Sequence, residues 1–145
     1  MAMRWIMLWI GILAVGSGQM AFAGDFDGSK TLQCKSAQGV QYHYSGNHQP
    51  FDPESVGLPQ TFIIDFKQGL IRPTRQSVIR RRSAIKRTEH VEEMLVLQGA
   101  EDGVEGVDDG VGWTLALMKN GRIVVTASGG DVGYIVFGRC RAQVP

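Results

Sequence analysis

Apolar and polar residues alternate along much of this chain, and this period of two constrains the fold more than any other feature. It is clearest at residues 61–66 (TFIIDF) and 112–118 (GWTLALM). Successive side chains of a β-strand point to opposite faces, so the alternation is typical of strands that bury one face. No window of about a dozen residues has the spacing of an amphipathic helix. We therefore predict an all-β protein.

Turn-forming residues separate the alternating runs and predict hairpins. The first two strands are expected to pair across a turn at residues 36–39. The strongest turn signal is Asn120-Gly121, because this dipeptide readily supplies the positive φ angles of a type I′ turn. The expected strands, eight or nine in number, include residues 31–35, 40–44, 61–66, 70–72, 94–98, 112–118, 122–127 and 132–140.

A meander of short antiparallel strands avoids exposed edges by closing into a barrel or by folding into two layers. We predict a closed or nearly closed small barrel, with a two-layer β-sandwich as the alternative. The inward positions carry mostly large side chains, which favours a filled interior over a ligand cavity. The expected core residues are Leu32, Phe62, Ile64, Phe66, Leu95, Leu97, Trp113, Leu115, Leu117, Ile123, Val125, Tyr134 and Val136.

Cys34 and Cys140 are the two cysteines of the chain, and they lie far apart in the sequence. A disulfide is the default for such a pair in an exported protein, with a free redox pair or a metal site as the alternatives. The bond would stabilise the fold by about 4–5 kcal/mol, because it closes a loop of about 100 residues in the unfolded chain. It would also join the first strand to the last, which favours a closed barrel.

The first 23 residues have the layout of a secretory signal peptide. Arg4 precedes an apolar run at residues 5–15, and Ala21-Phe22-Ala23 has the small-x-small pattern of a cleavage site. An uncleaved membrane anchor is the alternative, but the apolar run is shorter than the roughly 20 residues that span a bilayer. We expect removal of residues 1–23, a single domain at 24–145 without a stable membrane span, and a periplasmic or secreted protein.

Charge is balanced over the whole chain but unevenly distributed. The 15 Lys and Arg against 14 Asp and Glu give no reason to expect nucleic acid as a partner. Residues 72–87, however, contain seven basic residues and no acid, whereas residues 89–109 contain eight acids and no Lys or Arg. Both segments are candidates for binding.

The acidic segment ends in EDGVEGVDDG, residues 101–110, between two predicted strands. An acidic loop can supply oxygen ligands to calcium, but this order matches neither the EF-hand consensus nor the calcium-binding nonapeptide, and we assign no metal site. A partner-docking loop and a solvated hairpin tip are the other interpretations. The candidate partner-binding residues are Glu101, Asp102, Glu105, Asp108 and Asp109.

The basic segment contains three consecutive arginines, which cannot all face one side of a regular strand. We therefore expect a bulge or bend near Ser83, or one arginine that is paired inward. The segment could bind an anionic partner such as phosphate, an acidic glycan or an anionic lipid. Alternatively, its arginines discourage edge pairing and balance the acidic segment. The candidate anion-binding residues are Arg75, Arg80, Arg81, Arg82 and Arg87.

Recognised catalytic motifs are absent from the sequence: it contains no GxSxG, no HExxH, no P-loop and no GxGxxG after a strand. His43 and His48, near Tyr42 and Tyr44, could hold a metal or a polar ligand, but two histidines five residues apart make a poor site. His90 stands among acids and is expected at the surface. We expect no cofactor, and an enzyme is the least favoured function class.

The resemblance of this chain to other proteins rests on five segments: residues 26–34 (FDGSKTLQC), 58–66 (LPQTFIIDF), 94–99 (MLVLQG), 112–117 (GWTLAL) and 132–140 (VGYIVFGRC). Together they are similar to a group of small secreted proteobacterial proteins without an established function. The resemblance covers most of residues 24–145 and implies a common exported β domain, with no catalytic residue to carry over. Residues 101–110 look like an extension of one branch, since this connection is shorter in the other proteins.

These features together predict a small exported binding domain. We expect an accessory subunit or modulator of another envelope protein, which would use the acidic loop or the basic segment as its docking surface. A periplasmic carrier of a small apolar or anionic ligand, held in a barrel cavity, is the alternative. A hydrolase without a recognisable motif is the third candidate.

Overall fold

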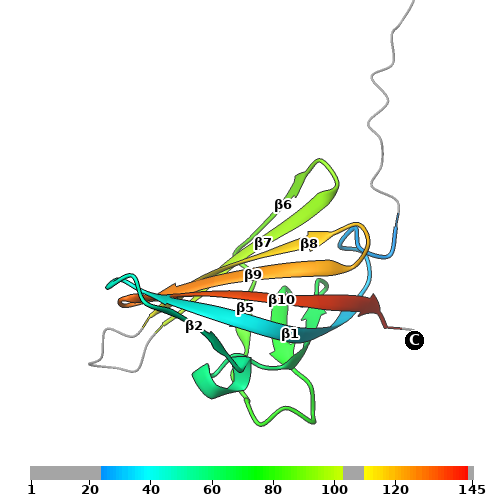
Figure 1. The fold of residues 1–145 in the computed structure, drawn as a ribbon. Helices are drawn as coiled ribbons and strands as arrows, with labels where there is room; N and C mark the ends of the chain where they lie inside the picture. Colours follow the sequence, from blue (N-terminus) through cyan, green and yellow to red (C-terminus); the bar gives the residue numbers. More distant parts are fainter. Residues whose placement is uncertain (1–23, 103–109, 144–145) are drawn as a thin grey trace, which may run out of the picture.

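The computed structural model describes residues 24–102 and 110–143, and the predicted signal peptide lies outside this part of the chain. The described residues form an antiparallel all-β fold with no α-helix, as predicted (Figure 1). The elements are β1 (Leu32–His43), β2 (His48–Phe51), the 3-10 helix η1 (Pro53–Val56), β3 (Thr61–Asp65), β4 (Leu70–Pro73), β5 (Ser83–Ala84), β6 (Arg87–Val91), β7 (Met94–Glu101), β8 (Val111–Met118), β9 (Arg122–Gly129) and β10 (Val132–Ala142).

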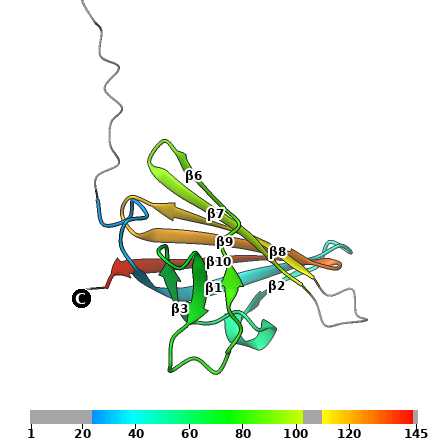
Figure 2. The same ribbon diagram turned by 180° about the vertical axis from the view of Figure 1, so that it is seen from behind.

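The strands form one curled sheet in the order β5-β4-β3-β1-β10-β9-β8-β7-β6, and β2 pairs with β1. We call its part formed by β1, β10, β9, β8, β7 and β6 the large sheet. The large sheet faces the viewer in Figure 1, and Figure 2 shows the short strands β3 to β5 on its other side. The two ends of the sheet approach each other where β5 continues into β6. There Ile85 N donates to Gly69 O on the β4 side and Lys86 N donates to Gln98 O on β7, both at 2.8 Å. The result is a half-barrel that is nearly closed, in agreement with the prediction.

Residues 31–44 do not form the predicted hairpin. β1 is a single strand that pairs with β10 along its whole length, and the turn expected at 36–39 is a β-bulge. Ser36 lies opposite Gly138 and Gln38 lies opposite Phe137, so Ala37 is the extra residue. The extra residue shifts the alternation by one, since the buried residues are Leu32, Cys34 and Ser36 before the bulge and Gly39 after it, while pairing with β10 resumes at Gln38. The strand therefore keeps its pairing with β10, which a turn would have ended.

The Asn120-Gly121 turn joins β8 to β9 as expected, but the type I′ assignment is wrong. Only Gly121 has a positive φ, at 79°, and its amide donates to Met118 O at 2.9 Å. This geometry is that of a three-residue loop with a left-handed glycine. The Asn120 side chain accepts from the Arg122 amide at 3.1 Å and thereby stabilises this loop.

The predicted disulfide is confirmed. Cys34 on β1 and Cys140 on β10 are direct cross-strand partners and are bonded. The Cys140 amide donates to Gly121 O at 2.7 Å, on the side of β9, so Cys34 and Cys140 form a non-hydrogen-bonded pair. Cα atoms approach most closely in such pairs, and here they are 3.9 Å apart. The bond holds the first strand of the meander against the last.

A tightly packed core fills the half of the sheet that contains the disulfide. Its buried residues are Leu32, Cys34, Phe62, Ile64, Leu95, Leu97, Leu115, Leu117, Ile123 and Cys140. The N-terminal loop closes the end of this half: Phe26 packs against the core and Gly28 approaches Leu95 and Phe66. Within this loop the Ser29 hydroxyl and amide donate to Asp27, which lowers the pKa of the Asp27 carboxyl. Most of the predicted core residues lie in this half.

Candidate functional site: a cavity inside the curled sheet

On two strands, β7 and β9, the side chains that point into the curled sheet become smaller away from the disulfide. On β7 the inward residues change from Leu95 and Leu97 to Gly99, and on β9 they change from Ile123 to Ala127. Large residues fill one half of the interior, whereas glycine and alanine leave the other half open. The sequence itself thus encodes an interior with a packed end and an open end.

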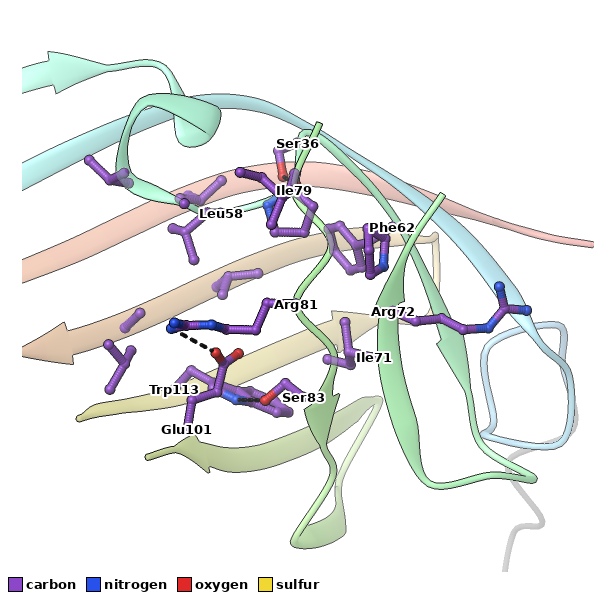
Figure 3. Close-up of a pocket in the computed structure, with 18 of the residues that line it drawn as sticks. Ser36, Leu58, Phe62, Ile71, Arg72, Ile79, Arg81, Ser83, Glu101 and Trp113 are labelled. Atoms are coloured by element: carbon purple, nitrogen blue, oxygen red, sulfur yellow. Dashed lines mark hydrogen bonds and ion pairs between the residues drawn. The ribbon is translucent and has the colours of Figure 1, made fainter. Parts of the chain in front are cut away.

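A cavity of about 490 Å³ occupies the open half (Figure 3). This volume lies within the range of small-molecule sites. The large sheet contributes one wall, made of Val111, Trp113, Leu115, Val125, Ala127 and Val136. The opposite wall and the cover come from η1, β3, β4 and the loops beside them, with Val56, Leu58, Pro59, Phe62, Ile71, Pro73, Val78 and Ile79. The lining is predominantly apolar.

The cavity contradicts the expectation of a filled interior, and Trp113 shows why. Trp113 lies directly opposite Gly99 on the neighbouring strand. A Cβ atom built at Gly99 would overlap the indole ring and would lie 2.5 Å from the Ala84 carbonyl oxygen. The indole therefore occupies the place of the missing Gly99 side chain and lies against the sheet. A large residue at an inward position does not reach the centre of the barrel here.

Two buried serines face the cavity and are engaged with the walls. Trp113 Nε1 donates to Ser83 Oγ at 2.7 Å, which ties β8 to β5 across the closure of the sheet. Ser36 Oγ donates to Pro59 O at 3.5 Å on the cover. Both serine side chains are therefore part of the cavity wall.

Removing the Trp113–Ser83 hydrogen bond should destabilise the fold. Ser83→Ala leaves the indole N–H without its acceptor, and we expect the free energy of unfolding to fall by about 1–2 kcal/mol. Urea denaturation followed by circular dichroism measures the loss. The exposed Ser128→Ala on β9 is the matched control, and equal midpoints for the two variants would contradict the prediction.

A single ion pair stands where the cavity meets solvent. Arg81 Nη1 lies 3.4 Å from Glu101 Oε2, and Figure 3 shows the two side chains facing each other across the opening. The Arg81 side chain is 56% exposed and that of Glu101 is 24% exposed, which places the pair at the boundary between cavity and water. Arg80 also borders the cavity. Charge is thus confined to one end of an otherwise apolar site.

Comparison with known proteins adds no homologue. No family model, curated protein or solved structure matches this chain. The disulfide fits an oxidising, non-cytoplasmic compartment. Across residues 24–102 and 110–143, we find no helix of the length and apolarity needed to cross a membrane.

The five predicted anion-binding arginines do not form one site. Arg81 is paired with Glu101, and Arg87 on β6 is paired with Glu89 at 2.9 Å. Arg80 Nη1 donates to the Arg75 carbonyl oxygen at 3.3 Å, and the Arg75 and Arg82 side chains are exposed on the loop before β5. The expected irregularity near Ser83 is present as this loop. Of the five, Arg80 and Arg81 line the cavity. Arg72, the first arginine of the basic segment, also contributes to the lining, although its side chain extends away from Arg81 in Figure 3.

Few of the other predicted residues contribute to the cavity. Of the acidic loop, Glu101 lies at the mouth and Asp102 is exposed, while Glu105, Asp108 and Asp109 lie outside the described residues.

The histidines lie away from the cavity. His43 and His48 line a separate polar hollow, where His48 stacks on Tyr42 with ring centroids 5.4 Å apart. The described part of the chain contains no group of three potential metal ligands. His90 is exposed on β6, with Nε2 3.2 Å from Asp27 O.

Sequence reasoning missed one charged group entirely. Lys35, Arg122, Arg139 and Arg141 are exposed on the outer face of three adjacent strands, β1, β9 and β10. They are scattered along the chain, so a search for contiguous basic runs does not find them. The alternation in RCRA, residues 139–142, was the available signal, because it places Arg139 and Arg141 on the face opposite to buried Cys140.

Proposed function

We propose that this protein is a periplasmic or secreted carrier that binds one small amphiphilic molecule in the cavity. The observation that carries the proposal is a cavity of about 490 Å³ with an apolar lining and a single charged end. Ligand sites are commonly apolar concavities in which a few polar groups fix the orientation of the ligand. The apolar body of the molecule would lie against Leu115, Val125 and Val136.

The polar end of the ligand would lie at Arg81. The Arg81–Glu101 pair is long and partly exposed, and such pairs contribute only about 0–1 kcal/mol. A carboxylate, sulfonate or phosphate on the ligand can therefore replace Glu101 as the partner of Arg81 at small cost. Arg80 adds a second positive charge beside it. The site consequently favours an anionic head group over a cationic one.

The cover of the cavity can open without disruption of the sheet. It consists of residues 56–59 and 78–81, both outside regular strands. Ser77 Oγ and Glu54 Oε1 connect the two loops at 3.5 Å, the limit of a hydrogen bond. Ligand entry through this cover would leave the disulfide and the packed core in place.

Two fluorescent probes of the same shape test the proposal: neutral N-phenylnaphthylamine and anionic anilinonaphthalene sulfonate. Of the three Trp in the sequence, Trp5 and Trp9 lie in the predicted signal peptide, so Trp113 is the sole donor for energy transfer to a probe in the cavity when the protein begins at Gly24. We expect saturable binding of both probes with one site per chain. Val125→Phe, which fills the cavity, should weaken both at least tenfold.

The matched control is Val124→Phe, one residue away on the same strand but on the outer face. It should leave both affinities unchanged. Arg81→Gln should weaken the anionic probe about tenfold and the neutral probe little, because a charge-assisted hydrogen bond is lost. Failure of both probes to bind, or equal binding by the two phenylalanine variants, would overturn the proposal.

The other functions expected from the sequence find less support. The docking loop of an accessory subunit falls mostly on residues 103–109, outside the described residues, so that function remains a proposal without a structural argument. The cavity mouth presents Arg80, Arg81 and Glu101, and no pair of carboxylates suited to hydrolysis lines it among the described residues.

A further inference from the structure

The outer face of the large sheet carries an uncompensated group of positive charges. We define the outer basic patch as Lys35, Arg122, Arg139 and Arg141. Lys35 lies directly opposite Arg139, and Arg139 lies directly opposite Arg122. Because neighbouring strands are about 4.8 Å apart, these three residues form a row about 10 Å long. Arg141 is two residues from Arg139 and therefore shares its face.

The arrangement of the outer basic patch is unfavourable for the isolated protein. Like charges directly opposite each other destabilise a sheet, and this row contains two such pairs. No carboxylate among the described residues forms an ion pair with any of the four side chains. Arg141 is held by a neutral partner, since its Nη2 donates to Gln33 Oε1 at 2.9 Å. Such a row is compensated only by negative charge from outside the described fold.

An apolar row follows the patch on the same face. Phe137 lies two residues before Arg139 and is 51% exposed. Val124, Ala116 and Val96 continue from Phe137 in direct register across β9, β8 and β7. The outer face therefore combines unpaired cations with exposed apolar surface. A partner that offers only negative charge would contact the cations and leave the apolar surface exposed to water.

We propose that the outer face docks this protein on the surface of a membrane that contains anionic lipids. The four cations would contact lipid phosphates or other anionic head groups, and Phe137 would enter the interfacial region beside them. Positive residues close to an anionic bilayer each strengthen binding about fivefold. The proposal does not rest on the cavity, which lies on the opposite face of the sheet, so it can fail or succeed independently of the carrier function.

Vesicle sedimentation at physiological salt tests the docking. The exported protein is used, and its intact mass establishes at which residue it begins. Vesicles of equal parts phosphatidylglycerol and phosphatidylcholine should bind the protein, and vesicles of phosphatidylcholine alone should not. Lys35→Gln/Arg139→Gln should weaken binding to the anionic vesicles about 30-fold, from about fivefold for each charge. Its melting temperature should not fall, because the substitution removes a like-charge pair.

The control for net charge is Arg75→Gln/Arg82→Gln, which removes two exposed arginines outside the patch. Charges beyond about 8 Å are screened at this salt concentration, so the control should change binding by less than about threefold. Equal weakening by the two double variants would reduce the effect to net charge and overturn the proposal. So would failure of the wild-type protein to bind anionic vesicles.

Phe137 distinguishes a membrane from a soluble polyanion or an acidic protein. Phe137→Ser should weaken binding to the anionic vesicles several-fold and leave binding to polyglutamate unchanged, whereas Val91→Ser, at another exposed apolar residue, should affect neither. If Phe137→Ser leaves vesicle binding unchanged and polyglutamate binds as tightly as the vesicles, the patch recognises acidic polymers, and the membrane assignment is wrong.

Discussion

Replacing both cysteines, with Cys34→Ala/Cys140→Ala, should lower the free energy of unfolding by about 4–5 kcal/mol. The bond joins residues separated by 106 positions, and in the chain-entropy model a loop of this length restricts the unfolded chain by about that amount. Domains of this size have only about 5–15 kcal/mol in total, so the variant should be close to its unfolding threshold. Urea denaturation followed by circular dichroism gives the change in midpoint.

Reduction provides the control for the cysteine variant. Dithiothreitol should bring the wild-type protein to the stability of the double variant and should not change the variant itself. A loss below about 1 kcal/mol would mean that the β1–β10 pairing alone holds the ends of the meander together. The stability of this junction would then come from the 11 residue pairs between β1 and β10 and not from the covalent bond.

The second large effect is expected at Gly99. Gly99→Ala places a methyl group against the Trp113 ring and 2.5 Å from the Ala84 carbonyl oxygen. The ring lines the cavity, into which we expect it to move, and the carbonyl belongs to the backbone that closes the sheet. Overpacking of this kind typically costs about 1–3 kcal/mol, and we expect the upper end because a backbone atom must move. Probe binding in the cavity should weaken as well, since the displaced indole would occupy it.

Two other glycines provide a comparison for the stability loss expected at Gly99. For Gly39→Ala, the three atoms nearest to the new methyl group all belong to the side chain of Phe51 on the short strand β2, and the substitution should cost less because a side chain moves more easily than the backbone. A Cβ at Gly133 meets nothing within 4 Å, so Gly133→Ala should be neutral or slightly stabilising. Thermal denaturation of the three variants gives the order of stability, and a Gly99→Ala variant as stable as Gly133→Ala would refute the overlap.

The sequence predicts those parts of the fold that depend on local alternation. The strands from β7 to β10 appear where the period of two places them, because each buries one face against a common core. The disulfide was predictable because two cysteines allow a single intramolecular pairing. β6 was not predicted because all five of its residues are exposed. A strand that buries neither face has no alternation of apolar and polar residues.

Non-local contacts account for the failures. Whether Ser36 and Ala37 form a turn or a bulge is decided by β10, about 100 residues away in the chain, which pairs on both sides of the irregularity. The cavity depends on which inward residues face each other across the curled sheet, and no single strand reveals that Trp113 covers Gly99. The outer basic patch likewise exists only in the register of β1, β9 and β10.

The division of the interior into a packed end and an open end separates two requirements that compete in most small domains. Cooperative folding requires a dense, invariant set of contacts, whereas release of a guest requires a region that can rearrange at low cost. Here both properties are found along the same strand, β8: Leu117 lies in the dense part, Val111 lies in the open part, and Leu115 lies where the two meet. In the proposed carrier, substitutions that alter ligand binding can therefore accumulate at the open end while the packed core at the other end is left unchanged.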